Sequence, residues 1–324
     1  MRAVRCEAYG EPETLVLREL PDLTARPGQV VVDIHAAALN FPDVLTVADR
    51  YQVSTPVPFT PGSEFAGVVR EVGDGVTEWS PGDRVLGARA VGAFAEQIAV
   101  SPADLRAVPD GLDLVHAAAF QVTFSTAYHS LVTAGGLQPG EWVVVLGASG
   151  GVGSATVDVA HRLGARVLAA ASDLVRLELA TRLGADAVID YSTEDLKARI
   201  KEITGGGAAL VVDPVGGEYA EQALRAIRWG GRFVSVGFAA GEVPRIPLNL
   251  VLLKNVTVRG MELRSWNQRM PEAFAAADAE LARLVAEGMR PEVSRTHPLA
   301  ETAQALAGVA GRRALGKTVI NTRA

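Results

Sequence analysis

A glycine-rich turn in the middle of the chain constrains the fold more than any other feature. The segment VVVLGASGGVGSATVDVAHRLG (143–164) passes from an apolar run through clustered glycines into an amphipathic stretch. Glycine permits a sharp turn from strand to helix and lets the backbone approach a ligand closely. The amino terminus of the helix presents unpaired N–H groups and the positive end of its dipole, which together bind anions such as a pyrophosphate.

The glycine pattern alone has two explanations. Ala148 stands where the fingerprint G-x-G-x-x-G has its first glycine, so Gly150 and Gly153 are the second and third. A tight turn between any strand and helix explains these glycines as well as a dinucleotide does. The context favours the dinucleotide, because the loop follows an apolar strand, opens a helix and begins a series of strand–helix pairs.

That series predicts a parallel, doubly wound sheet. Helical segments such as LVRLELATRLG and EYAEQALRAIRWG end at glycine, as helices often do. The strands are apolar throughout, which suits a sheet covered on both faces. We expect them at Trp142–Ala148, Arg166–Ala171, Ala187–Asp190, Ala209–Asp213, Arg232–Gly237 and Val256–Gly260.

The first hundred residues have a different pattern. Short runs with alternating apolar residues, such as FAGVVREVG and FAEQIAV, are separated by Pro and Gly and predict a β-rich, barrel-like domain. The helix-like stretch LVHAAAFQVTFSTAYHSLVTAG marks a hinge into the second domain. A late strand, KTVIN, is expected to return to the first. At about 150 residues per domain, 324 residues also suggest two domains.

The composition and net charge of the chain limit the classes of molecule that it is expected to bind. The chain has no apolar run near the roughly 18 residues of a membrane-spanning helix, and its first residues lack a signal-like apolar core, so we expect a cytoplasmic protein. A net charge of -6 disfavours nucleic acid and anionic membranes. Cys6 is the only cysteine, which excludes an intrachain disulfide and a cysteine-cluster metal site. Small molecules remain as partners.

The end of the second expected strand indicates which dinucleotide binds. NAD sites usually have an Asp or Glu there, whereas this strand ends in Ala171 and Ser172. Arg176 follows and could bind a 2'-phosphate through charge-assisted hydrogen bonds, which favours NADP(H). Two alternatives stay open: Asp173 takes an NAD-like role, or Arg176 is a solvated helix residue beside Asp173 and Glu178.

Four motifs in order, AAALNFPDVL, VPFTPGSEFAGVVREVG, GASGGVG and VVDPVGG, resemble the medium-chain dehydrogenase/reductase family. The likeness covers essentially the whole chain and is greatest to its zinc-independent quinone oxidoreductase, or zeta-crystallin-like, branch. It implies an α/β protein with a GroES-like catalytic domain, residues 1–121 completed by 263–324. It also implies a Rossmann NADP(H)-binding domain at 122–262.

The resemblance further implies a homodimer formed through the Rossmann sheets. The segment IPLNLVLLKNVTVRG (246–260) is the candidate pairing edge. The same segment could instead be the last strand and its approach, buried within one subunit.

Zinc is not expected. Where zinc-dependent relatives carry their catalytic ligands, this chain has Asn40-Phe41-Pro42-Asp43 and Gly62-Ser63-Glu64. Its histidines are scattered singly, which does not suit a tetrahedral site. Without a Lewis acid, hydride transfer is easiest to an electron-poor acceptor such as a quinone or an α,β-unsaturated carbonyl.

The resemblance also implies contacts for an NADPH cofactor. The residues are Gly150, Gly151, Val152 and Gly153 at the pyrophosphate, Ser172, Arg176 and Tyr191 at the 2'-phosphate, Thr123 and Phe238 near the nicotinamide, and Arg312 at the phosphate end. Two of these roles have alternatives: Tyr191 could equally be an aromatic residue that packs the third strand against a helix, and Arg313 could replace Arg312.

Asn40 and Tyr51 are the catalytic candidates, because the resemblance places both in the substrate pocket. A tyrosine there could donate a hydrogen bond or proton to the developing oxygen of the acceptor. Tyr51 could also be an ordinary loop residue that shields the core. Some relatives have a second tyrosine where this chain has Leu45.

These observations predict an NADPH-dependent quinone oxidoreductase. An enoyl-thioester reductase is an alternative that shares every cofactor residue. A non-catalytic NADPH-binding protein with a structural or RNA-binding role is an alternative of another class. The negative net charge of the chain, and the lack of a stretch in which basic and aromatic residues alternate, disfavour RNA binding.

Overall fold

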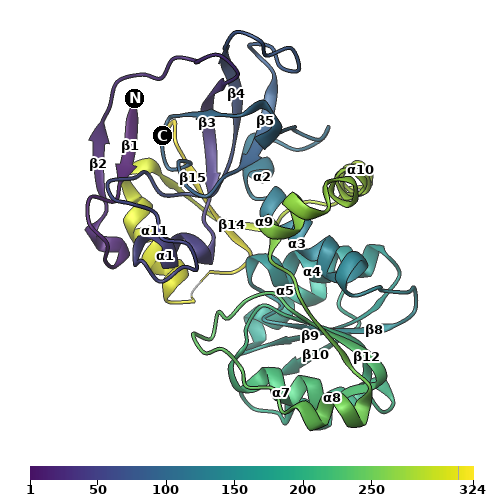
Figure 1. The fold of residues 1–324 in the computed structure, drawn as a ribbon. Helices are drawn as coiled ribbons and strands as arrows, with labels where there is room; N and C mark the ends of the chain where they lie inside the picture. The colour runs from purple at the N-terminus through teal and green to yellow at the C-terminus, as the bar shows by residue number, and fades with distance from the viewer. Residues whose placement is uncertain (313) are drawn as a thin grey trace. The chain divides into compact units, whose positions relative to one another are not determined.

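The computed structural model describes residues 1–312 and 314–324, which form two compact units (Figure 1). The first unit contains Met1–Val122 and Arg290–Ala324, and the second contains Thr123–Met289. The first division lies beside the expected boundary at 121/122. Residues 263–289, expected in the first domain, group with the second unit, where Phe274 stacks on His129 with 3.9 Å between ring centroids.

The second unit is built on a six-stranded sheet in the order β10-β9-β8-β11-β12-β13. All neighbouring strands are parallel, which confirms the predicted Rossmann-like sheet. The order reverses between β8 and β11, and in such sheets ligands bind outside the carboxyl ends of the strands at that point. The strands are β8 Trp142–Leu146, β9 Arg166–Ala171, β10 Ala187–Asp190, β11 Ala208–Asp213, β12 Ile227–Ser235 and β13 Thr257–Gly260.

Helices cover both faces of this sheet, as its apolar strands require. Figure 1 shows α4 and α5 on one face and α7 and α8 on the other. The helices of this unit, apart from α3 Gln121–Tyr128 that leads into it, are the π-helix η3 His129–Ala134, α4 Gly151–Arg162, α5 Leu174–Arg182, α6 Leu196–Thr204, α7 Gly217–Arg225, α8 Leu248–Lys254, α9 Leu263–Arg269 and α10 Pro271–Ala286.

The expected boundary between the helix and the strand near Gly230 is wrong. The sequence EYAEQALRAIRWG predicts a helix up to Gly230, but α7 ends at Arg225 and β12 begins at Ile227. Ile227 is fully buried and pairs with Ala208 of β11, so the apolar core holds it in the sheet. Tertiary packing therefore outweighs the local helical pattern here.

The first unit is a seven-stranded sheet in the order β14-β15-β3-β4-β5-β7, with β6 also paired to β3. The late strand β15 returns to the first unit, as predicted for KTVIN, and pairs antiparallel with β3. A separate hairpin joins β1 and β2. The elements are β1 Arg2–Arg5, β2 Val16–Glu19, β3 Val30–Ala38, β4 Glu64–Val72, β5 Arg84–Ala88, β6 Gln97–Val100, β7 Leu105–Ala107, β14 Val293–Pro298 and β15 Lys317–Asn321, with helices α1 Phe41–Val47, α2 Leu114–Ala118 and α11 Thr302–Ala310 and three short 3₁₀ turns, η1 Pro12–Thr14, η2 Pro102–Asp104 and η4 Leu299–Glu301.

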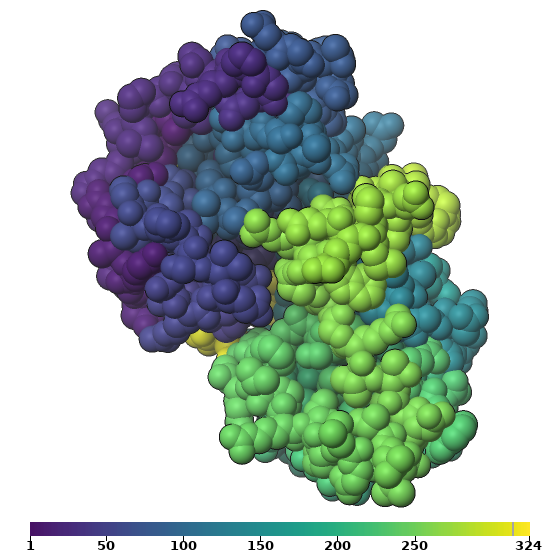
Figure 2. Space-filling view, viewed as in Figure 1, coloured from purple at the N-terminus to yellow at the C-terminus, as the bar shows by residue number. Residues whose placement is uncertain are grey.

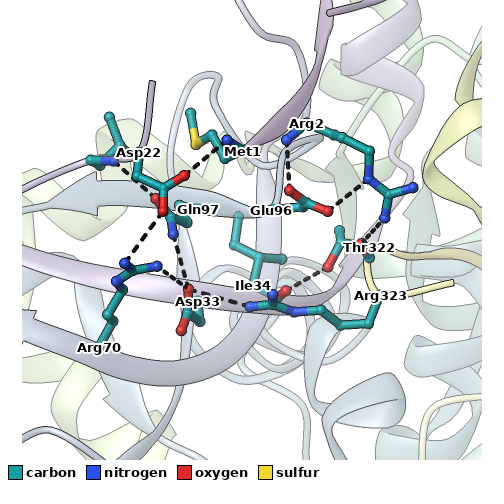
Figure 3. Close-up of polar contacts among 11 residues, drawn as sticks. Met1, Arg2, Asp22, Asp33, Ile34, Arg70, Glu96, Gln97, Thr322 and Arg323 are labelled. Carbon is teal, nitrogen blue, oxygen red and sulfur yellow. Dashed lines mark hydrogen bonds and ion pairs between the residues drawn. The ribbon is translucent and has the colours of Figure 1, made fainter. Parts of the chain in front are cut away.

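Polar contacts join the two ends of the chain within the first unit (Figure 3). Arg2 pairs with Glu96 at 2.7 Å and donates to the carbonyl of Thr322 at 3.3 Å. Arg323 pairs with Asp33 at 3.3 Å. Each partly exposed pair contributes at most about 1 kcal/mol, so this network aligns the ends more than it stabilises the core.

No helix in the described part of the chain is long and apolar enough to cross a membrane.

Candidate functional site

The glycine turn after β8 has the geometry that its sequence predicts. Gly147 has a φ of +57°, in the left-handed region that favours glycine. A Cβ on Gly153 would lie 2.1 Å from the carbonyl oxygen of Gly147, so no side chain fits there. Gly153, the third glycine of the fingerprint, thus lets helix α4 pack directly against the turn. Gly150 is less constrained, because a Cβ there would meet no atom closer than 3.5 Å.

The amino terminus of α4 carries the four residues expected at the pyrophosphate, Gly150, Gly151, Val152 and Gly153. Gly150 is the N-cap, and no side chain caps the helix. The amide groups of the first turn therefore lack the side-chain acceptor that usually satisfies them, and an anion can take its place.

Arg176 is held at the carboxyl end of β9. Asp173 caps helix α5, because its Oδ1 accepts from the backbone N–H of Arg176 at 3.0 Å. The Oδ2 of Asp173 accepts from Arg176 Nε at 2.9 Å, and Arg176 Nη1 donates to Ser149 Oγ of the glycine loop at 3.1 Å. The guanidinium thus reaches from its own helix to the glycine loop, and both oxygens of Asp173 are engaged within that helix.

Tyr191 lies on the neighbouring strand end. Its backbone N–H donates to the carbonyl of Ala171 at 3.0 Å, which places Tyr191 beside the end of β9. Its ring packs on Tyr219 of α7 with the centroids 4.2 Å apart. Ser172, Arg176 and Tyr191 therefore share one edge of the sheet. The packing on α7 also agrees with the structural role considered for Tyr191.

Three further candidates belong to other elements of the chain. Thr123 is buried in the first residues of the second unit, and Phe238 follows β12, where it packs near Gly216. Arg312 follows α11 in the first unit and has a φ of +55°. The alternative residue Arg313 lies outside the described residues.

Asp213 at the end of β11 was not predicted as a functional residue. It is fully buried, and its Oδ1 accepts from the N–H groups of Val215 and Gly216, each at 2.8 Å. Burial raises the pKa of this carboxyl. Its Oδ2 has no hydrogen-bond partner among the described residues. Asp213 fixes the turn that packs against Gly147, and the acid inside the apolar motif VVDPVGG was the signal for it.

Asn40 belongs to a buried polar cluster in the first unit. Its Nδ2 donates to Ser63 Oγ at 3.3 Å and to Glu64 Oε2 at 3.1 Å. Lys317 Nζ, from β15, donates to Asn40 Oδ1 at 2.6 Å and to Glu64 Oε2 at 3.2 Å. Both hydrogens of the Asn40 amide thus have protein acceptors. Glu64 and Lys317, which the sequence did not single out as partners, orient Asn40.

Two carboxyls of this cluster have different electrostatic surroundings. Glu64 is fully buried and paired with Lys317, and its Oε1 also accepts from the N–H of Val122 at 2.7 Å, in the first turn of α3. Asp43 is also buried, and burial raises its pKa to about 6. Hydrogen bonds from Ser63 and from the Asn40 backbone, together with the charge of Lys317, oppose that rise.

Tyr51, the second catalytic candidate, is half-buried in the segment after α1. Leu45, which stands where some relatives have a tyrosine, is half-buried within α1. No cluster of three or more His, Cys, Asp or Glu side chains suited to a metal ion occurs among the described residues.

Comparison with known proteins identifies the family. Residues 26–110 match the model of the alcohol dehydrogenase GroES-like domain, and 151–279 match that of the zinc-binding dehydrogenase. The quinone oxidoreductase-like protein 2 homolog of Nematostella vectensis is 36% identical over 99% of this chain and 89% of its own length. The chain belongs to the medium-chain dehydrogenase/reductase family. The family is one of oxidoreductases, so the chain is an enzyme of that class.

Solved structures of this family have the same fold. Escherichia coli quinone oxidoreductase complexed with NADPH has a TM-score of 0.93 at 28% identity, with 99% of this chain and 100% of that chain covered. An NAD-dependent alcohol dehydrogenase has a TM-score of 0.89 at 31% identity, with 99% and 100% covered. Since both cofactors occur on this fold, the residues at the end of β9 have to distinguish them.

Proposed function

We propose that this chain is an NADPH-dependent quinone oxidoreductase that transfers hydride to a quinone or an activated enone without zinc. The observation that carries the proposal is the position of Arg176, which is hydrogen-bonded to Asp173 and to Ser149 of the glycine loop. The adjacent strand β9 ends at Ala171, and Ser172 follows it, so no acid stands at the strand end. The 2'-phosphate of a dinucleotide bound on this loop would therefore meet the guanidinium of Arg176 and no acid at the strand end, which favours NADPH over NADH.

The candidate residues have distinct tasks in binding NADPH. The N–H groups of the first turn of α4 hold the pyrophosphate, and Arg176 with Ser172 and Tyr191 holds the 2'-phosphate. Thr123 and Phe238 would hold the nicotinamide, and the resemblance assigns Arg312 to the phosphate end. When bound, NADPH supplies the hydride, and the protein supplies orientation and a suitable electrostatic field.

The buried cluster around Asn40 supports chemistry without zinc. Asn40, Ser63 and Glu64 stand where zinc-dependent relatives have ligands, and here Lys317 Nζ lies within 3.2 Å of both Asn40 and Glu64. A divalent cation in this cluster would be repelled by the ammonium group. The acceptor therefore has to be electron-poor already, as quinones and α,β-unsaturated carbonyls are.

Tyr51 and Asn40 act on the acceptor in different ways. The phenol of Tyr51 donates a hydrogen bond to the oxygen on which negative charge develops. Asn40 lines the acceptor site, and its amide is fixed by Lys317 and Glu64.

The enzyme acts as a homodimer in the cytoplasm, formed through the outer edge of the second unit. Leu248, Leu252 and Leu253 of α8 are between 71% and 80% exposed, and β13 is exposed along its whole length. Figure 2 shows the green segment that contains α8 on the surface. Within the single chain Leu250 and Val256 are buried in the core, whereas most other residues of this segment are exposed. An apolar helix beside an open strand edge suits pairing with a second copy.

Turnover with a panel of acceptors tests the proposal. We expect quinones to oxidise NADPH faster than NADH in the presence of the enzyme, with enals and enoyl thioesters measured in parallel. Arg176→Ala serves as the control, because it should lose the preference for NADPH and keep the acceptor profile. Absence of turnover with every acceptor would refute the proposal, and preference for an enoyl thioester would favour the related reductase.

A further inference from the structure

Asp43 is a buried carboxyl to which the proposed function assigns no task. It lies on α1, is 3% exposed, and its Oδ2 accepts from the backbone N–H of Asn40 at 2.7 Å. The hydroxyl of Ser63 is near enough to the Asp43 carboxyl to lower its pKa. Ser63 is itself half-buried and accepts from Asn40 Nδ2 at 3.3 Å. Ser63 thus connects a buried acid to the residue proposed to line the acceptor site.

The charges of the cluster explain why Asp43 keeps a proton readily. Lys317 Nζ has three acceptors: the carbonyl of Leu39 at 2.9 Å, Asn40 Oδ1 and Glu64 Oε2. Its charge is therefore matched by Glu64, and Asp43 is a second carboxyl without a cation of its own. An unpaired carboxylate in a protein interior is unfavourable, so the protonated form is favoured.

The groups that face Asp43 come from several elements. The Asn40 N–H, the Ser63 hydroxyl and Lys317 favour the carboxylate, whereas burial and the negative charge of Glu64 favour the acid. Helix α11, which packs against α1, carries no charged residue between Thr302 and Ala310. Burial is the largest of these influences, and the resulting pKa of about 6 lies close to neutrality.

We infer that Ser63 and Asp43 form the route by which the reduced acceptor receives its proton, an inference that rests on the proposed function. After hydride transfer the acceptor holds two additional electrons and needs one proton. Its oxygen takes the hydroxyl proton of Ser63 as the Ser63 O–H bond breaks, and Ser63 takes the proton of Asp43. The Asp43 carboxylate then recovers a proton from water. Overall NADPH is oxidised, the quinone is reduced to the hydroquinone, and one proton is consumed.

Asn40 and Tyr51 are less suited to giving this proton. An amide does not release a proton near neutral pH, and both Asn40 hydrogens already point to Ser63 and Glu64. A phenol has an ordinary pKa of about 10, whereas an acid that titrates near the working pH transfers its proton more efficiently. Asn40 therefore acts as a positioning residue for Ser63, and Tyr51 acts as a hydrogen-bond donor.

The pH dependence of kcat at saturating NADPH tests this route. In the wild type we expect kcat to fall about tenfold per pH unit above a break near pH 6, because only protonated Asp43 can deliver a proton. Ser63→Ala should lower kcat by about a hundredfold and abolish both this break and the solvent isotope effect. Ser63→Thr retains a hydroxyl and should restore most of kcat and the break. The NADPH dissociation constant should be unchanged in both variants.

Asp43→Asn should also abolish the break, and the two Ser63 variants keep the test valid if Asp43→Asn does not fold. An active wild type whose kcat and pH profile survive Ser63→Ala would overturn this inference alone. Loss of the break in Tyr51→Phe, with Ser63→Ala unaffected, would assign the proton to Tyr51 and overturn it too. A wild type without turnover would overturn the proposed function and this inference together.

Discussion

The two candidate sites of this enzyme are built in opposite ways. In the second unit, the glycine turn uses consecutive residues and backbone groups, and Arg176 of helix α5 is held beside it by a partly exposed ion pair with Asp173. In the first unit, Asn40, Glu64 and Lys317 come from distant parts of the sequence and meet in the interior. The first kind of site is shaped by backbone conformation, and the second kind is shaped by the compensation of buried charges.

This difference predicts where the chain is most sensitive. A buried charge that loses its partner is strongly destabilising, because the remaining group cannot return to water. A partly exposed pair contributes little to stability, and its loss is expected to alter ligand binding instead.

Lys317→Met should be the most damaging change. It leaves Glu64 buried and unpaired, which should lower the free energy of unfolding by about 3–5 kcal/mol. Denaturant unfolding at neutral pH measures this change. The double variant Lys317→Met with Glu64→Gln removes both charges and should recover a large part of the loss. Equal destabilisation in the single and double variants would show that charge compensation is not what stabilises this cluster.

Gly153→Ala should disrupt the glycine turn and leave the first unit intact. The new Cβ would meet the carbonyl oxygen of Gly147 at 2.1 Å, so the turn has to move, at a cost of about 1–3 kcal/mol. We expect NADPH titration to show at least about tenfold weaker binding. Gly308→Ala in α11 is the matched control, because its Cβ meets nothing within 4 Å. Unchanged NADPH binding in Gly153→Ala would contradict the proposed cradle.

Two buried groups, His129 in the second unit and Asp43 in the first, should contribute to the pH dependence of stability with opposite signs. Burial lowers the pKa of His129 below its ordinary value of 6.5, so stability from this group is complete above pH 6.5 and declines as the pH falls. Burial raises the pKa of Asp43 from 3.8 to about 6, so stability from this group is complete below pH 3.8 and declines as the pH rises through 6.

Unfolding measured as a function of pH checks both signs. His129→Phe should remove part of the acid-side decline, since His129 already stacks on Phe274 and a phenyl ring can do the same. Asp43→Asn should remove part of the decline between pH 4 and 6. A His129→Phe profile that parallels the wild type throughout would contradict the contribution assigned to His129.

Asp173→Asn should have the smallest effect on NADH. Both oxygens of Asp173 are engaged by Arg176, and asparagine caps a helix as well as aspartate does. We expect the NADH dissociation constant to change less than about twofold. Isothermal titration with NADH measures it, and weakening of about tenfold or more would show that Asp173 binds the ribose, as NAD-selecting acids do.

The same contrast explains how much could be predicted from the sequence. Strands β9 and β10 have the predicted bounds, and the sharp turn from β8 into α4 was predictable, because the residues that form it are adjacent in the sequence. The partnership of Glu64 with Lys317 was not predicted, since only the fold brings β4 and β15 to the two sides of Asn40. A lysine at the start of the apolar run KTVIN was the available signal. The helix expected up to Gly230 failed for a related reason: burial of Ile227 in the sheet is a tertiary effect.

Whether Arg176 selects NADPH is tested most directly by the ratio of the NADPH and NADH dissociation constants, measured by titration in the wild type and in Arg176→Ala. Charge-assisted hydrogen bonds to the 2'-phosphate contribute about 1.5–3 kcal/mol, so the wild type should bind NADPH roughly ten- to a hundredfold more tightly than NADH. Arg176→Ala should remove this preference by weakening NADPH alone. A wild type that binds NADH as tightly as NADPH, or an Arg176→Ala variant that loses affinity for both equally, would contradict the account.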